Sequence, residues 1–178
     1  MSRALGIVLL FCAAVPAALS AQSEKTLRSA TLVKQLGVAL LEHKLDAIAA
    51  RDPEAPNRFV AALFFPDSQM LVVSASYSSP SVLDEKLGQK NYREVYLDLG
   101  TTQFADTSMF FQDMNADGLS HDRDQTADIL YEGRTSTIFD GDWKKHGLSE
   151  KAYEKRLTDA DDRYSRLLEL LLAQVQAT

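Results

Sequence analysis

The fold is decided by the stretch Arg58-Phe59-Val60-Ala61-Ala62-Leu63-Phe64-Phe65, Pro66-Asp67-Ser68-Gln69, Met70-Leu71-Val72-Val73-Ser74-Ala75-Ser76-Tyr77. Two apolar runs flank a short segment of turn-forming residues. This pattern predicts a β-hairpin, and the almost unbroken apolar character predicts strands that are partly buried on both faces. Because this is the most hydrophobic part of the chain after its N-terminus, we expect the hairpin at the centre of the sheet.

Working outward, the C-terminal side of this hairpin predicts further strands. Apolar and polar residues alternate in one segment, another is rich in aromatic residues, and two more flank Gly133 as a second hairpin. Before them, Ser79-Pro80 is typical of a helix N-cap followed by proline, which predicts a short helix to about Gln89. The predicted strands are Arg93 to Leu99, Ser108 to Gln112, Asp128 to Glu132 and Thr135 to Phe139.

Two longer amphipathic helices are predicted near the ends of the chain. The first runs from Ser23 to Ala50 and ends before Pro53, since proline disfavours helix at the preceding residue. The second begins after Ser149, a good N-cap, and runs to about Gln176. Apolar residues recur every three or four positions in both. They are Val33, Leu36, Leu40, Leu41, Leu45 and Ile48, and then Tyr153, Leu157, Ala160, Tyr164, Leu167, Leu171 and Val175.

Together these elements predict an α+β fold. We expect one domain over residues 22–178, with a mostly antiparallel sheet of about five or six strands flanked by the long N- and C-terminal amphipathic helices. The apolar stripes are expected to pack within the monomer, and a homodimer seam on the last helix is the alternative. A split-barrel arrangement that binds a small molecule such as a flavin is a second alternative.

Residues 1–21 have the layout of a secretory signal peptide. A basic start at Arg3 precedes an apolar stretch from Ala4 to Leu19 and the small residues Ser20 and Ala21. We expect cleavage and export to the periplasm or beyond the cell, with an uncleaved anchor as the alternative. The single cysteine, Cys12, lies in this segment. The mature chain is therefore expected to contain no disulfide, no thiolate metal site and no catalytic thiol.

The net negative charge of the chain disfavours some classes of binding partner. The full chain of 178 residues has a formal net charge of −6, and the signal segment contributes only one positive charge. An acidic chain without a long basic run repels nucleic-acid phosphates. We therefore expect no nucleic-acid partner and no membrane span after cleavage, and a protein or small ligand as the partner of a monomer or homodimer.

One stretch has the pattern of a metal site. The residues from Asp113 to Asp124, Asp-Met-Asn-Ala-Asp-Gly-Leu-Ser-His-Asp-Arg-Asp, resemble the twelve-residue calcium loop of EF-hands and dockerin-type modules. The sixth position is glycine because the chain turns there with positive φ. The resemblance implies Ca²⁺ bound by Asp113, Asn115, Asp117, the carbonyl of Leu119, and Asp124.

The loop departs from that pattern at its end. His121 is a poor calcium ligand, and Asp124 stands where a bidentate glutamate is usual. An empty polar turn, or a transition metal held by His121 with Asp117 or Asp122, are the alternatives. If calcium binds, its expected role is structural, since five acidic side chains crowd this region and would repel one another without it. They are Asp113, Asp117, Asp122, Asp124 and Asp128.

Motifs of catalysis are absent from the sequence. There is no nucleophile elbow, phosphate-binding loop, dinucleotide fingerprint or zinc-protease helix, and His43, His121 and His146 lie far apart. The turn around Trp143 is either a ligand cleft or, more often, a core edge. We expect an exported, non-enzymatic envelope protein that binds a partner or ligand, with one structural calcium ion if the loop is filled and an empty polar turn if it is not.

Overall fold

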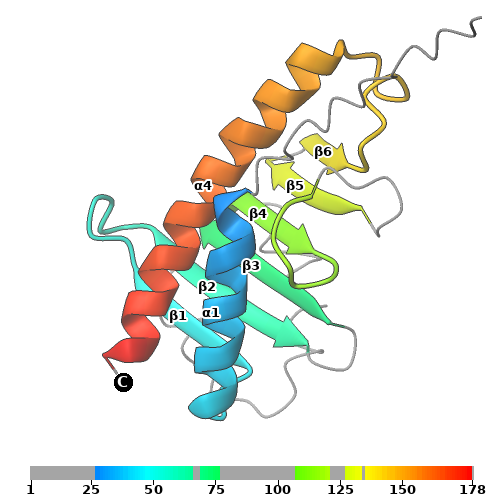
Figure 1. The fold of residues 1–178 in the computed structure, drawn as a ribbon. Coiled ribbons are helices and arrows are strands. Elements are labelled where there is room, and N and C mark those ends of the chain that lie inside the picture. Colours follow the sequence, from blue (N-terminus) through cyan, green and yellow to red (C-terminus); the bar gives the residue numbers. More distant parts are fainter. Residues whose placement is uncertain (1–26, 66–68, 77–106, 121–126, 134, 178) are drawn as a thin grey trace, which may run out of the picture.

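The computed structural model describes residues 27–65, 69–76, 107–120, 127–133 and 135–177. In these residues six antiparallel strands form one sheet with two flanking helices, as Figure 1 shows. The predicted α+β class is confirmed. The strands are β1 (Ala47–Arg51), β2 (Phe59–Phe65), β3 (Met70–Ser76), β4 (Thr107–Asp113), β5 (Asp128–Glu132) and β6 (Thr135–Phe139), and the helices are α1 (Arg28–Glu42) and α4 (Glu150–Gln176).

The predicted first hairpin is confirmed and lies inside the sheet. Strands β2 and β3 pair along their whole length, from Phe59 opposite Ser76 to Phe65 opposite Met70. Strand order follows the chain, so β1 and β6 are the two edges. The described strands therefore form an open sheet.

Both faces of the central strands are buried, as the hairpin sequence predicts. Val60 and Val73 are 0 % exposed and belong to the large core beneath the helices. Leu63 and Val72 are 3 % and 1 % exposed and belong to a second cluster on the opposite face. Because side chains alternate between faces, successive apolar residues serve both clusters.

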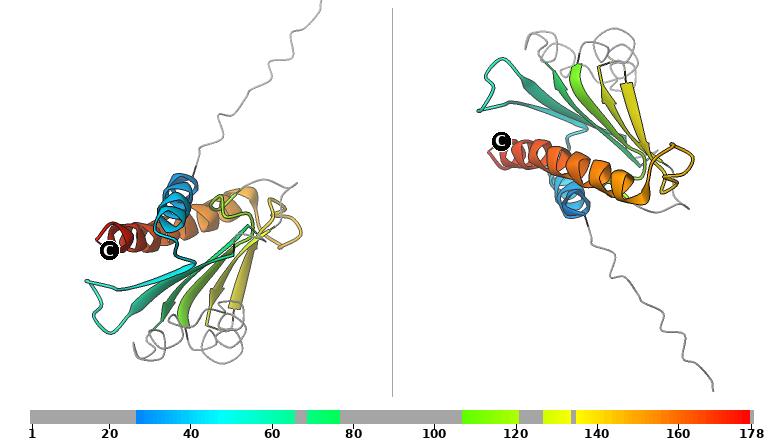
Figure 2. Two further views of the ribbon diagram at one scale, coloured as in Figure 1. Left: turned by 90° about the horizontal axis from the view of Figure 1, so that it is seen from below. Right: turned by 90° about the horizontal axis from the view of Figure 1, so that it is seen from above.

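Helix α4 lies between the sheet and α1, which Figure 2 shows from two sides. All of the stripe residues predicted for this helix are at most 3 % exposed. Asp161 and Ser165 are buried as well, because a helix covered on two sides has few exposed positions. The apolar stripe of α4 is thus buried within the monomer. The Oγ of Ser149 accepts a hydrogen bond from the backbone N–H of Ala152 at 3.2 Å, which confirms the predicted N-cap.

The prediction of one helix from Ser23 to Ala50 is wrong. Helix α1 ends at Glu42, and Lys44 adopts a left-handed φ of +56°. The N–H of Leu45 donates to the carbonyl of Leu40 at 2.8 Å, and that of Lys44 donates to Leu41 at 3.1 Å, which closes the helix as a Schellman motif. The chain then enters β1, where pairing with β2 overrides the helical spacing. Leu41, predicted to be buried, is 61 % exposed.

Two predictions lie outside the described residues, namely the short helix from Ser79 to Gln89 and the strand from Arg93 to Leu99. The predicted strands on either side of Gly133 and the aromatic strand before Asp113 are confirmed as β5, β6 and β4. In the part of the chain that the structure describes, no helix is long and apolar enough to span a bilayer.

Candidate functional site

The acidic loop leaves the sheet at Asp113, the last residue of β4, whose side chain is fully buried. One carboxylate oxygen, Oδ1, accepts a hydrogen bond from the backbone N–H of Asp117 at 3.2 Å. The other, Oδ2, accepts from the N–H of Gly118 at 2.9 Å and from the hydroxyl of Tyr164 at 3.1 Å. The first position of the predicted calcium loop is therefore held by the loop itself and by α4.

Gly118 packs the loop against the first turn of α1. Its φ is +91°, which confirms the positive φ expected for the sixth loop position. A Cβ atom here would lie 2.4 Å from the backbone nitrogen of Ala30, so only glycine fits. Beside it, the N–H of Leu119 donates to the Oγ of Ser29 at 3.0 Å. The loop thus serves as a contact to α1 as well as a turn.

Helix α4 supplies the missing cap of α1. Leu27, at the N-cap position, makes no side-chain capping bond. Instead, the Asp161 carboxylate accepts hydrogen bonds from the backbone N–H groups of Arg28 at 2.9 Å and Ser29 at 3.0 Å. Free N–H groups at a helix start need such acceptors, and a negative charge there is favourable. The loop, α1 and α4 therefore meet at one junction.

A second buried carboxylate stands beside the first. Asp128, at the start of β5, is 2 % exposed, and its Oδ1 accepts from the N–H of Met114 at 3.1 Å. Burial, and then the charge of Asp113, raise the pKa of Asp128 to about 8. Burial also raises the pKa of Asp113 to about 6, with the charge of Asp117 adding to it. In the described residues no cationic side chain pairs with Asp113 or Asp128.

The structure describes four of the five predicted ligands. Asp113 is buried, whereas Asn115 and Asp117 are partly exposed on the loop. Leu119 is 3 % exposed, with its side chain in the core and its amide held by α1. Asp124 lies outside the described residues, as do His121 and Asp122. Asp128, which the sequence places only in the acidic surroundings, is brought to Asp113 by the pairing of β4 with β5.

The two buried carboxylates, Asp113 and Asp128, are not saturated with hydrogen bonds. A carboxylate has about four lone-pair sites; Asp113 uses three for the hydrogen bonds above, and Asp128 accepts from Met114 and Ser120. Both carboxylates thus retain acceptor capacity. Within the described ranges no three His, Cys, Asp or Glu side chains form a group that could hold a metal ion. The predicted calcium site would therefore need Asp124 as a further ligand.

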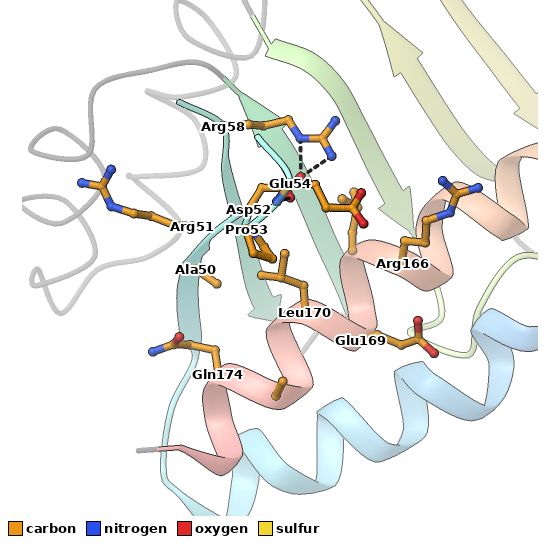
Figure 3. A pocket seen from close by; sticks show the side chains of 12 residues that line it. Ala50, Arg51, Asp52, Pro53, Glu54, Arg58, Arg166, Glu169, Leu170 and Gln174 are labelled. Carbon is orange, nitrogen blue, oxygen red and sulfur yellow. Dashed lines mark hydrogen bonds and ion pairs between the residues drawn. The ribbon is translucent and has the colours of Figure 1, made fainter. Parts of the chain in front are cut away.

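A separate cleft of about 590 Å³ lies between the turn after β1 and helix α4 (Figure 3). One wall carries Asp52, Glu54 and Arg58, and the other carries Arg166 and Leu170. The sequence gives no sign of this cleft, because the residues around Asp52 predict only the end of a helix. Only the pairing of β1 with β2 turns that segment toward α4.

The charges of the cleft are partly paired. Asp52 is 4 % exposed, and its Oδ2 accepts from Nε of Arg58 at 2.8 Å and also from Nη2. Hydrogen bonds from Arg58 and from the N–H of Glu54 oppose the effect of burial and lower the pKa of Asp52. Glu169, at the edge, pairs with Arg28 of α1. This leaves Glu54 and Arg166 exposed and without a side-chain partner in the described part of the chain.

The turn around Trp143 is held together internally. Asp140 accepts from Nζ of Lys145 at 2.9 Å and lies 2.8 Å from Nε2 of His146. Trp143 is partly buried against the main core, so it closes the core edge as the more common interpretation predicts. His43 is exposed at the end of α1.

Comparison of the chain with models of protein families, with curated proteins and with solved structures found no match.

Proposed function

We propose that this protein is an exported, non-enzymatic domain whose acidic loop binds one structural calcium ion. The observation that carries the proposal is the buried pair Asp113 and Asp128. Two carboxylates withdrawn from water repel each other and resist ionisation, as their raised pKa values reflect. A divalent cation would neutralise both, and oxygen ligands of this kind suit calcium.

The loop sequence supplies the rest of the proposed shell. Calcium takes about six to eight oxygen ligands. Asn115 and Asp117 would add side-chain oxygens, Leu119 its carbonyl, and Asp124 the closing carboxylate, as the calcium-loop pattern implies. Asp128 would be an additional ligand from β5.

The proposed role of the ion is to stabilise the fold. Asp113 ends β4 and Asp128 begins β5, so the ion would join two neighbouring strands. Tyr164 and Ser29 link the same loop to α4 and α1. Binding only to the folded state stabilises it in proportion to the logarithm of ligand concentration over Kd. We propose that this stabilisation acts after export, for which the basis is the signal-peptide layout of residues 1–21.

Calorimetry with calcium on chelator-treated protein tests the site. We expect saturable binding to one site and a higher melting temperature with calcium. Asp113→Asn and Asp128→Asn should abolish both effects, whereas Asp162→Asn, an exposed change on α4, should leave them intact. Absence of binding heat together with a melting temperature insensitive to calcium would refute the proposal.

The release of a proton on calcium binding tests whether Asp128 is a ligand. If Asp128 is protonated in the calcium-free protein at neutral pH, calcium must displace that proton. The binding enthalpy should then vary with the ionisation enthalpy of the buffer near pH 7. Calcium binding without proton release would remove Asp128 from the ligand set.

Export is tested separately by cell fractionation. A tagged full chain should appear outside the cytoplasm with an N-terminus at Gln22, and a chain without residues 1–21 should stay inside. Recovery of the full-length chain with its N-terminus intact in the membrane fraction would support the anchor instead.

A further inference from the structure

The cleft between the β1 turn and α4 has the size of a small-molecule site. Its volume of about 590 Å³ falls within the range of roughly 300 to 1,000 Å³ that ligand pockets occupy. None of the described residues of the acidic loop, 113–120, lines it. Any ligand here is therefore independent of the calcium proposal.

The walls of the cleft divide into a charged part and an apolar part. Figure 3 shows the side chains of Arg58, Glu54 and Arg166 around one end, with Leu170 below them. Ala50 and Leu167, which also line the cleft, are 7 % and 3 % exposed and form its apolar base. A ligand that matches both parts has a charged head and an apolar body.

The charged residues that line the cleft indicate the chemistry of the ligand's charged head group. Asp52 already neutralises Arg58, and the guanidinium of Arg51, which also lines the cleft, lies over the ring of Phe59, 4.8 Å from its centroid. In the described part of the chain, the lining charges without a side-chain partner are therefore Glu54 on the turn and Arg166 on the helix. They have opposite signs and stand on opposite walls. A purely anionic head would meet Glu54, and a purely cationic head would meet Arg166. A head that carries both charges satisfies both residues.

Arg58 adds donors for the negative half of such a head. A guanidinium has five N–H groups, and the two hydrogen bonds to Asp52 leave about three of them. The buried Asp52 also fixes the orientation of Arg58, which lowers the entropy lost when a carboxylate binds. Arg58 and Arg166 thus each offer N–H donors to an anionic group in the cleft.

We infer that this cleft binds a small zwitterion with an apolar body, of the chemical class of an α-amino acid with a large apolar side chain. Its carboxylate binds Arg166 and the free edge of Arg58, its ammonium group binds Glu54, and its side chain lies toward Leu170 and Ala50.

Calorimetry with three related probes tests this assignment. Phenylalanine carries both charges, phenylalaninamide lacks the carboxylate, and N-acetylphenylalanine lacks the ammonium group. Each loss should weaken binding to the native protein by about threefold to fivefold, as expected for an exposed ion pair. Arg166→Ala should reduce the penalty for the amide, because only Arg58 then remains to bind the carboxylate, and Glu54→Gln should abolish the penalty for the acetylated probe.

Arg156→Ala is the matched control, because Arg156 is an exposed arginine of α4 that does not line the cleft. It should leave all three affinities unchanged. No saturable heat with phenylalanine at millimolar concentration would overturn the inference, as would equal affinities for the three probes. Saturation by a short-chain phosphatidylcholine but not by phenylalanine would assign the cleft to a lipid headgroup and overturn the amino-acid class.

Discussion

The hydroxyl of Tyr164 donates a 3.1 Å hydrogen bond to Oδ2 of Asp113, and this contact joins the middle of α4 to the end of β4. Both side chains are fully buried, and the Tyr164 ring stacks on Phe111 with 4.6 Å between ring centroids. Burial, and then the charge of Asp113, raise the pKa of Tyr164 well above its usual value. Tyr164 therefore remains a protonated donor.

Removing this hydroxyl should destabilise the protein. Tyr164→Phe keeps the stacked ring but deprives a buried carboxylate of a donor, which should lower the free energy of unfolding by about 1.5 to 3 kcal/mol in calcium-free buffer. Urea denaturation measures the change. Tyr131→Phe is the control, since Tyr131 stacks on Phe110 without a hydrogen bond from its hydroxyl in the described residues. Equal effects of the two changes would show that the Asp113 contact contributes nothing.

Stability without calcium should fall as pH rises from about 4 to about 8. The pKa of Asp128 is raised from 3.8 to about 8 by burial and by Asp113, so between these values the folded state binds a proton that the unfolded state has lost. Stability is then complete below the unfolded pKa and is lost as pH rises through the folded one, with a slope of at most about 1.4 kcal/mol per pH unit for one group.

Urea denaturation across this pH range checks the prediction. Asp128→Asn keeps the shape and removes the charge, so the slope should flatten and the variant should be more stable than the native protein at pH 8 without calcium. Saturating calcium should also flatten the native slope. A native stability that rises between pH 5 and pH 8 in chelator would contradict the raised pKa.

Gly118 should tolerate no side chain. Gly118→Ala places a Cβ at a φ of +91° and 2.4 Å from the backbone of Ala30, which cannot move without shifting α1. We expect a loss of about 3 kcal/mol, from backbone strain and overpacking together.

Gly133→Ala separates these two causes. Gly133 has a φ of +58°, but nothing lies within 4 Å of the position that a methyl group would take there, so only the strain of about 1 kcal/mol applies. Thermal melting of both variants gives the comparison. A loss for Gly118→Ala no larger than that for Gly133→Ala would mean that contact with α1 is unimportant.

Asp161 should stabilise the first turn of α1 from α4. Asp161→Ala removes the acceptor for the N–H groups of Arg28 and Ser29 and should cost about 1 to 2 kcal/mol, as for loss of a helix cap. Hydrogen exchange should show faster exchange at these two amides. The neighbouring Asp162→Ala, at an exposed position, should leave both exchange rates unchanged.

Hydrophobic pattern alone was sufficient for most of the fold. The β2–β3 hairpin, the β5–β6 hairpin, the Ser149 cap and the buried stripe of α4 follow from local spacing and capping chemistry, which depend on neighbouring residues. The same spacing failed from Leu45 to Ala50. There Ile48 continues the helical stripe of α1, but pairing with β2 makes the segment a strand. A short apolar run fits both the helical and the strand periodicity, and only pairing with a strand elsewhere in the chain decides between them.

The candidate sites depend on tertiary structure to different degrees. The sequence by itself determined the roles of Asp113 and Gly118 in the acidic loop, because a tight loop requires those residue types at fixed spacing. Strand pairing brought Asp128 to Asp113, and helix packing added Tyr164 and Asp161. The cleft between Asp52 and Arg166 has no signature in the sequence, because its walls are more than a hundred residues apart. Spacing along the chain describes local geometry, whereas burial and the contacts between distant residues arise only when the chain has folded.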